Sequence, residues 1–220
     1  MRFTNRSDAG KQLADKLIAY LDRPQCIILA LPRGGVPVGF EIAQELHVPL
    51  NVILVRKLGV PGHEEVAFGA IANGNIRVLD KEIIQKLGIL PATIEQVTTA
   101  ERNELNYRKQ LYLGNNPAPE VKDYTVILVD DGMATGATMH AAIEAVRKQQ
   151  AARVVVAVPV AALSAYNAIG KLADEVVCLQ IPEPFHGVGA SYVDFTQIRH
   201  EEVQSLLRVM MSSAGSECII

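Results

Sequence analysis

Residues 126–138 constrain the fold of this chain more than any other segment. They read VILVDDGMATGAT, so an unbroken apolar run leads into two carboxylates and then into a short loop of small and hydroxyl residues. Such an apolar run is typical of a strand buried on both faces of a parallel sheet. An amphipathic pattern follows at about Ala137–Lys148. The segment is therefore predicted to be a strand–loop–helix unit of an α/β fold.

The loop has the chemistry of a phosphate site, and ligands of open α/β sheets bind beyond the carboxyl ends of the strands. A helix N-terminus there offers backbone N–H groups and a positive dipole end to an anion. The predicted phosphate-binding residues are Gly132, Met133, Ala134, Thr135, Gly136, Ala137 and Thr138. The preceding acids, Asp130 and Asp131, suit ligand hydroxyls or a hydrated Mg²⁺. A ribose 5-phosphate satisfies both halves, and the alternative is an ordinary turn capped by Asp131.

The same residues resemble a known signature. Four apolar residues, two acids, two variable residues, a small residue and T-G-x-T resemble the segment that binds 5-phosphoribosyl 1-pyrophosphate (PRPP) in type I phosphoribosyltransferases. A Walker A loop is excluded, because residues 132–138 are one residue too short and lack the lysine. The resemblance covers residues 26–60 and 124–200 well, and it covers residues 1–25, 61–123 and 212–220 poorly.

A second segment, residues 31–39, also lies where a predicted strand passes into a helix. Arg33 supplies a forked donor, and Gly34 and Gly35 expose backbone N–H groups. The segment resembles the pyrophosphate loop of the family, and the resemblance implies a cis peptide between Pro32 and Arg33. The alternative interpretation is a plain strand-to-helix turn.

Residues 56–66 follow the second predicted strand and are rich in Gly, Pro and charge. We expect a loop, and the resemblance implies a mobile lid over PRPP, although this segment is shorter than many lids of the family. Lys57 at its start is predicted to reach the pyrophosphate. Whether the segment is a catalytic lid is left open by the sequence.

Residues 181–195 follow the last predicted strand, at the place of the family's acceptor-binding hood. Their pattern resembles that of purine-using members, in which an aromatic residue stacks on the base and an acid reads its edge. Phe185 would stack, while Tyr192 and Asp194 complete the predicted acceptor site. The alternative is that these aromatics form the core of the hood. Ala134 occupies the position where enzymes acting on 6-oxopurines usually carry an aspartate.

Alternating strands and helices predict one α/β domain over residues 1–220, with a doubly wound, mainly parallel sheet. Its core spans about residues 26–180, with a helical insertion at about 76–121 and a C-terminal hood at about 181–200. Strands are expected at residues 26–31, 51–55, 126–129, 153–160 and 175–179, and a hairpin joins residues 68–72 to 76–80 around Asn73 and Gly74. Helices are expected at residues 36–46, 81–87, 91–113, 137–148, 163–172 and 200–210, after a first helix through about Leu21 that Ser7 or Asp8 caps.

Amphipathic patterns detail two of these helices. The first helix should bury one face made of Leu13, Leu17, Ile18 and Leu21. The second helix of the insertion carries Glu101, Arg102, Glu104, Arg108 and Lys109 on its polar side. We interpret that side as a solvated face with an i,i+4 ion pair between Glu104 and Arg108.

Composition excludes several classes of protein. The net charge of −3 gives no overall basic footprint, so nucleic acid is not an expected partner. The longest apolar stretch, residues 154–163, is too short to span a bilayer, and the N-terminus lacks the apolar region of a signal peptide. Three widely spaced cysteines, Cys26, Cys178 and Cys218, are interpreted as reduced, buried thiols of a cytoplasmic protein rather than as a metal site.

The sequence therefore predicts a Mg²⁺-dependent phosphoribosyltransferase that transfers the 5-phosphoribosyl group of PRPP to a planar acceptor such as a nucleobase. Asp130 and Asp131 are the predicted metal-binding and catalytic residues, together with Arg33 and Lys57. The resemblance also implies a homodimer. One alternative is a non-catalytic, PRPP-sensing regulator, and another is phosphorolysis or hydrolysis of a ribose phosphate. The identity of the acceptor is not predicted.

Overall fold

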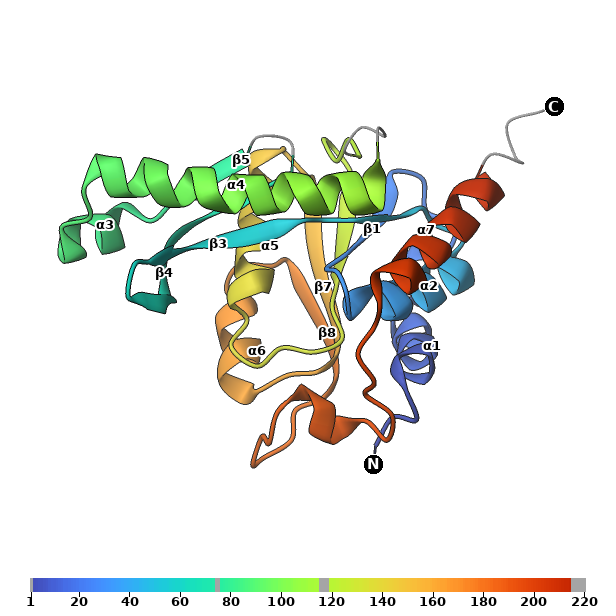
Figure 1. Ribbon diagram of the computed structural model, residues 1–220. Coiled ribbons are helices and arrows are strands. Elements are labelled where there is room, and N and C mark those ends of the chain that lie inside the picture. The colour runs from blue at the N-terminus through green and yellow to red at the C-terminus, as the bar shows by residue number, and fades with distance from the viewer. Residues whose placement is uncertain (1, 74–75, 115–118, 215–220) are drawn as a thin grey trace.

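The computed structural model describes residues 2–73, 76–114 and 119–214. A central sheet of five parallel strands has the order β2-β1-β6-β7-β8. The strands are β1 (Cys26–Ala30), β2 (Leu50–Val52), β6 (Thr125–Val129), β7 (Arg153–Val160) and β8 (Glu175–Gln180). Figure 1 shows helices on both faces of this sheet, as the doubly wound prediction requires.

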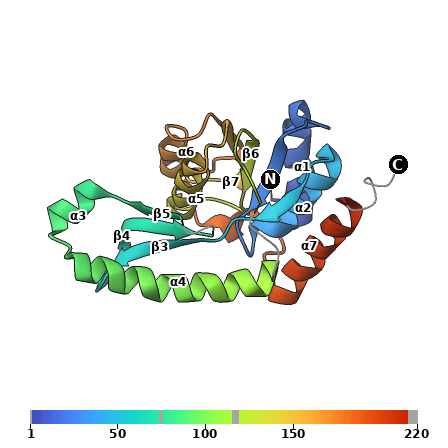
Figure 2. The same ribbon diagram turned by 90° about the horizontal axis from the view of Figure 1, so that it is seen from above.

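Each face of the sheet has its own hydrophobic core, because side chains alternate along a strand. Ile28, Ile127 and Val155 pack toward the first face, whereas Ile27, Val126 and Val154 pack toward the second. The first face is covered by α1 (Arg6–Lys16), α2 (Gly35–Leu46) and α7 (His200–Ala214), and the second by α5 (Ala137–Lys148) and α6 (Leu163–Ile169) (Figure 2). Burial on both faces explains why these strands are apolar without alternation.

Helix α1 differs from its predicted form at both ends. Asn5, rather than Ser7 or Asp8, is the N-cap, and its side chain accepts a hydrogen bond from the Asp8 N–H. The helix ends at Lys16 and a separate 3₁₀ turn follows at Ile18–Tyr20. This break rotates the last predicted core positions toward solvent, so Ile18 is 60% exposed and Leu21 is 41% exposed.

Residues 55–79 form a second, antiparallel sheet of three strands. It contains β3 (Val55–Val60), β4 (His63–Ala72) and β5 (Ile76–Leu79). The expected loop at residues 56–66 is therefore wrong: only Pro61 and Gly62 form the turn, and the flanking residues pair with each other. The strand predicted at residues 51–55 is also divided, because the chain leaves the parallel sheet after Val52. The predicted β4–β5 pairing is confirmed, although Gly74 lies outside the described residues.

Helices α3 (Lys81–Leu87) and α4 (Pro91–Leu113) complete the insertion, which thus begins with strand β5 rather than being wholly helical. Asp80 caps α3, and Pro91 occupies the first turn of α4 as predicted. Figure 2 shows α4 running alongside the small sheet toward α7. Within the described parts of the chain, no helix is long and apolar enough to cross a membrane.

The C-terminal hood closes against the N-terminus. Residues 181–199 are mostly irregular, with one 3₁₀ turn at Val188–Ser191. Phe3 forms a parallel bridge with Tyr192, and its N–H donates to the carbonyl of Ser191 at 2.9 Å. The rings of Phe3 and Tyr192 pack with their centroids 5.4 Å apart. The N-terminal residues and the hood therefore meet beside the carboxyl edge of the main sheet.

Candidate functional site

The two segments that the sequence singles out meet at the switch point of the main sheet. Strands β1 and β6 are parallel neighbours, with Ala30 opposite Val129, and the chain order runs in opposite directions on either side of them. The N–H of Leu31 donates to the carbonyl of Val129 at 2.8 Å, which extends the pairing beyond both strands. Ligands of open α/β sheets bind in the crevice at such a point.

Gly34 and Gly35 let the two segments approach more closely than any side chain would allow. A Cβ atom on Gly34 would lie 1.9 Å from Oδ2 of Asp131, and one on Gly35 would lie 2.5 Å from the carbonyl oxygen of Val129. The backbone of residues 33–35 therefore packs directly on the acidic pair. The cis peptide expected between Pro32 and Arg33 is confirmed.

The loop of residues 132–138 is anchored at its start and open at its end. Met133 is buried, its N–H donates to Val160 at 2.9 Å, and its carbonyl accepts from Ala162 at 2.9 Å. Thr135 and Thr138 are exposed. Gly136, with φ of 74°, is the N-cap of α5, and the Ala137 N–H donates to the Thr135 hydroxyl at 3.4 Å rather than to Asp131, so the alternative of a turn capped by Asp131 is wrong. The first N–H groups of α5 point toward this open loop.

Arg6 is the site residue that the sequence did not reveal. Its Nε atom lies 2.8 Å from Oδ2 of Asp131, and a second guanidinium nitrogen donates to the carbonyl of Thr196 at 2.9 Å. The guanidinium also lies 3.9 Å from the centroid of the Phe195 ring. Only 8% of Arg6 is exposed. The first turn of α1 thus supplies a buried counter-ion to the acidic pair.

Tyr192 holds the acidic pair from the hood. Its hydroxyl donates to the backbone carbonyl of Asp131 at 2.7 Å, and the residue is buried. The N–H of Asp131 donates in turn to Oδ1 of Asp130 at 2.8 Å. Tyr192, which the sequence placed in the acceptor site, therefore fixes the position of Asp131.

Burial changes the proton affinity of both acids. Desolvation and the neighbouring Asp131 raise the pKa of Asp130 well above its ordinary value. Desolvation also raises the pKa of Asp131, while the Arg6 guanidinium opposes that shift. Both residues are largely buried, because the hood and α1 pack over them.

Three basic residues lie near the loops of residues 31–35 and 132–138, each in a different place: Arg33, Arg56 and Lys57. Arg33 is half-buried, and its positive charge opposes the rise that burial causes in the pKa of the Tyr112 hydroxyl of α4. Lys57 lines a cavity of about 300 Å³ together with Ala137 and the first turns of α5. Its neighbour Arg56 points to the opposite face of β3, as strand geometry requires, and lines a small cavity with Pro32.

Two further hood residues make contacts within the hood. Phe185 is half-buried and packs against the cluster that contains Phe3 and Tyr192. Asp194 is exposed and accepts hydrogen bonds from the N–H of Thr196 at 2.9 Å and from its hydroxyl at 2.5 Å. These hydrogen bonds lower the pKa of Asp194. Its carboxylate therefore closes a local turn.

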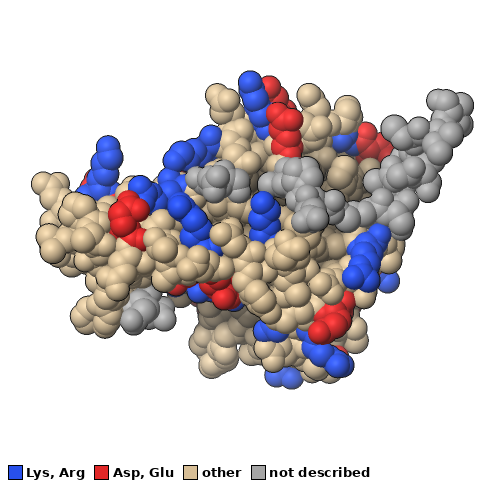
Figure 3. Space-filling view, turned by 45° about the horizontal axis from the view of Figure 1, so that its top comes forward, with Lys and Arg blue, Asp and Glu red and all other residues tan. Residues whose placement is uncertain are grey.

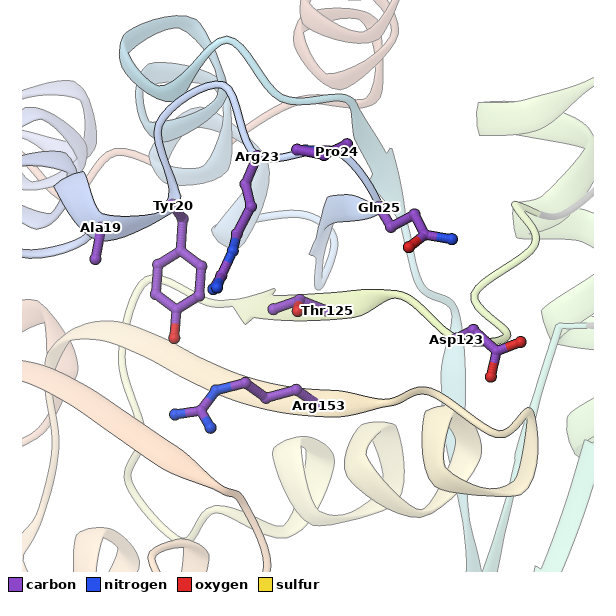
Figure 4. A pocket seen from close by; sticks show the side chains of 8 residues that line it. All are labelled: Ala19, Tyr20, Arg23, Pro24, Gln25, Asp123, Thr125 and Arg153. Carbon is purple, nitrogen blue, oxygen red and sulfur yellow. The ribbon is translucent and has the colours of Figure 1, made fainter.

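A cavity of about 450 Å³ lies at the opposite, amino edge of the main sheet (Figure 4). Its polar groups include Tyr20 and Arg153, both of which hydrogen-bond to Glu175. None of the residues of the two loops lines it. Because the loop of residues 132–138 and the acidic pair lie at the carboxyl edge, we place the candidate site there.

A family model and two curated relatives indicate the same protein family for this chain. A family model described as a phosphoribosyl transferase domain matches residues 3–194. In Mycobacterium tuberculosis, strains CDC 1551 and H37Rv each contain a relative that is 41% identical over 205 residues, and its name assigns it provisionally to the phosphoribosyl transferases. The match covers 93% of this chain and 46% of the relative, so the chain spans about half the length of these curated relatives.

Two solved structures resemble the chain. The crystal structure of TT1426 from Thermus thermophilus is 39% identical, has a TM-score of 0.84, and is matched over 94% of this chain and 98% of that chain. The AQ2163 protein from Aquifex aeolicus shares the fold, with a TM-score of 0.50 at 13% identity over 80% of this chain and 74% of that chain.

The ion pair between Arg6 and Asp131 should be important for stability. Arg6→Met would leave a buried carboxylate without its counter-ion, which typically costs about 3–5 kcal/mol. The free energy of unfolding in urea measures this loss. Lys11→Met on the exposed side of the same helix is the matched control and should change stability by less than about 0.5 kcal/mol. Equal effects of the two substitutions would refute the structural role of Arg6.

The raised pKa of Asp130 should make stability depend on pH. A carboxyl whose pKa is higher in the folded state favours folding at low pH, and this contribution is lost as the pH rises from the unfolded-state pKa through the folded-state pKa. A tenfold change in proton affinity between the two states corresponds to about 1.4 kcal/mol. Asp130→Asn should therefore raise the melting temperature relative to the wild type increasingly from pH 5 to pH 8. Asp15→Asn on the exposed face of α1 is the control, and a difference for Asp130→Asn that does not grow with pH would contradict the assignment.

Proposed function

The chain belongs to the phosphoribosyl transferase family, and we propose that it transfers the 5-phosphoribosyl group of PRPP to a planar nitrogenous acceptor, with release of pyrophosphate. One observation carries the proposal. The backbone of the Arg33–Gly35 segment packs on Asp131, so a pyrophosphate-type loop and a ribose phosphate loop share one crevice. A ligand with phosphates at both ends of a ribose matches that arrangement.

Each part of the crevice has a proposed partner on PRPP. The first N–H groups of α5 and the hydroxyls of Thr135 and Thr138 bind the 5-phosphate. Asp130 and Asp131 accept hydrogen bonds from the ribose hydroxyls. Arg33 and the amides of residues 34–35 bind the pyrophosphate. Because Lys57 lies beside Ala137, we now assign its ammonium group to the 5-phosphate side rather than to the pyrophosphate.

The acidic pair also fits the proposed Mg²⁺. Among the residues that the structure describes, no three His, Cys, Asp or Glu side chains cluster to form a complete metal cage. Mg²⁺ commonly takes only one or two carboxylates and fills its octahedron with water and phosphate oxygens. Asp130 and Asp131 supply that number of carboxylates at the edge of the crevice. When bound there, Mg²⁺ would neutralise charge on the pyrophosphate.

The reaction requires little covalent chemistry from the protein. The anomeric carbon gains oxocarbenium character as the pyrophosphate leaves, so the site has to hold the two reactants in line and stabilise the leaving charge. Arg33 and the glycine amides supply that charge stabilisation. The fixed position of Asp131, held by Arg6 and Tyr192, keeps the ribose oriented.

One observation favours a second candidate, a PRPP-sensing regulator that does not catalyse transfer. The segment expected to be a mobile lid is instead paired in the β3–β4 hairpin. A regulator needs the phosphate loop but not a lid that excludes water during catalysis. The two candidates differ in turnover and not in ligand binding.

Exchange of labelled pyrophosphate into PRPP, measured across a panel of planar bases, separates these candidates. The transferase should show base-dependent exchange, whereas a regulator should bind PRPP without exchange. Asp130→Asn combined with Asp131→Asn should abolish PRPP–Mg²⁺ binding by calorimetry. Because Asp131→Asn also removes the counter-ion of the buried Arg6, the titration is made well below the melting temperature of the variant, where circular dichroism reports a folded chain. Undiminished PRPP affinity in that double variant would rule out the proposed roles of both acids.

The acceptor should not be a 6-oxopurine. Ala134 is exposed at the loop but cannot exchange a proton with the ring of hypoxanthine or guanine, and such transfer typically contributes about 10²–10⁴-fold to the rate. We expect weak turnover with both bases, and efficient turnover with either would refute this expectation. Phe185→Ala should raise the KM of the true acceptor and leave PRPP affinity nearly unchanged. The exposed hood residue Val193, changed to Ala, is the control.

A further inference from the structure

Helix α4 contributes a charged residue to the wall of the crevice. Arg108 of α4 and Arg56 of β3 line a small cavity, whose other walls include Pro32 of the pyrophosphate-type loop and Thr138 of the phosphate loop. Figure 3 shows Lys and Arg side chains on the face that carries α4, with Asp and Glu side chains among them. The two guanidinium groups therefore lie beside both loops that the proposed function assigns to PRPP.

Arg33 follows Pro32 directly in the pyrophosphate-type loop, and Pro32 borders the cavity that Arg56 and Arg108 line. The loop therefore carries one arginine itself and lies beside two more from β3 and α4. Burial raises the pKa of the Tyr112 hydroxyl of α4, and the positive charges of Arg108 and Arg33 both oppose that shift.

Arg56 and Arg108 each form a partly exposed ion pair with a glutamate of α4. Nε of Arg56 lies 2.6 Å from Glu101, and Nε of Arg108 lies 2.8 Å from Glu104. Both pairs are about one-third exposed, and exposed ion pairs contribute little to stability. A guanidinium carries five N–H donors, so either arginine can contact a second anion beside its glutamate or exchange partners.

A solvated helix face explains the predicted Glu104–Arg108 pair, which the structure confirms, but it does not explain where Arg108 lies. Other basic residues of the same helix line a different cavity: Arg102 and Lys109 lie with Asn73 and Ile76, away from Pro32. The position beside the pyrophosphate-type loop is therefore specific to Arg108 among these polar residues of α4.

We propose that Arg108, together with Arg56, binds the pyrophosphate group of PRPP, so that α4 forms one wall of the substrate site. The proposal rests on the proposed function. Guanidinium groups are suited to it because they can make two parallel hydrogen bonds to a phosphate. In the bound state the pyrophosphate replaces Glu104 as the main partner of Arg108.

Calorimetric titration with two separate ligands tests this assignment: inorganic pyrophosphate with Mg²⁺, and ribose 5-phosphate. Arg108→Ala should weaken pyrophosphate binding by about tenfold or more, since a charge-assisted contact is lost, and should leave ribose 5-phosphate binding within about twofold. Arg102→Ala removes the same charge from the same helix at a distant position and should change neither affinity.

A second pair of variants tests the exchange of partners. Glu104→Gln removes the resting partner of Arg108 and should tighten pyrophosphate binding severalfold. Glu95→Gln changes the net charge equally on the same helix, but its partner is Arg77, so it should have no comparable effect. Because both glutamates are substantially exposed, these substitutions should leave the fold intact.

The outcomes separate this inference from the proposed function. If the wild type binds neither ligand, the proposed phosphoribosyl site is wrong and the role of Arg108 is wrong with it. If the wild type binds both ligands and Arg108→Ala binds pyrophosphate with unchanged affinity, only the role of α4 is overturned. Equal weakening of both ligands by Arg108→Ala would also overturn it, because that result would indicate general damage to the site.

Discussion

The buried ion pair between Arg6 and Asp131 is the interaction on which the arrangement of the site depends. Asp130 and Asp131 follow a fully buried strand, and the loop of residues 33–35 packs directly on Asp131. Taking a carboxylate out of water costs several kcal/mol unless a counter-ion and hydrogen bonds compensate. Arg6 supplies the counter-ion at 2.8 Å. Helix α1 and the hood are therefore parts of the site, because Arg6 also holds the hood at Thr196.

The two loops remain open to a ligand because their backbones are held by contacts elsewhere. Met133 is hydrogen-bonded to residues 160 and 162 at the end of β7, and Tyr192 holds the carbonyl of Asp131. These contacts leave Thr135 and Thr138 exposed, and the N–H groups that follow Ala137 in the first turn of α5 have no intrahelical acceptor. A site built on rigid supports can keep its donors in place before the ligand arrives, which is how preorganised charge stabilisation works.

Local sequence was sufficient for strands β1, β6, β7 and β8, for the positions of both loops, and for the helices α4 and α5, because each is specified by contiguous residues. The pairing of Arg6 with Asp131 could not be predicted, since the two residues are 125 positions apart and no spacing rule links them. The hairpin at β3 and β4 was missed for a different reason. Gly59, Pro61 and Gly62 indicated a loop. In the structure, Pro61 and Gly62 form the two-residue turn, and Gly59 lies where the pairing register of β3 and β4 shifts. Pairing between two segments decided both cases, across 125 positions for Arg6 and Asp131 and across a two-residue turn for β3 and β4.

Burial of Asp130 and Asp131 disfavours their ionised forms in the folded protein, although ligand binding would require those forms. The raised pKa of Asp130 means that the folded protein resists ionising the carboxyl group that a ribose or Mg²⁺ would require. A bound cation would favour the ionised form and compensate part of the desolvation. Ligand binding should then be coupled to proton release and to a more stable fold, because the same charges oppose folding in the empty site. Arg6 limits this conflict, because its charge opposes the raised pKa of both acids and its ion pair holds Asp131. Asp130, whose pKa is raised well above its ordinary value, is then the stronger link between ligand binding and pH.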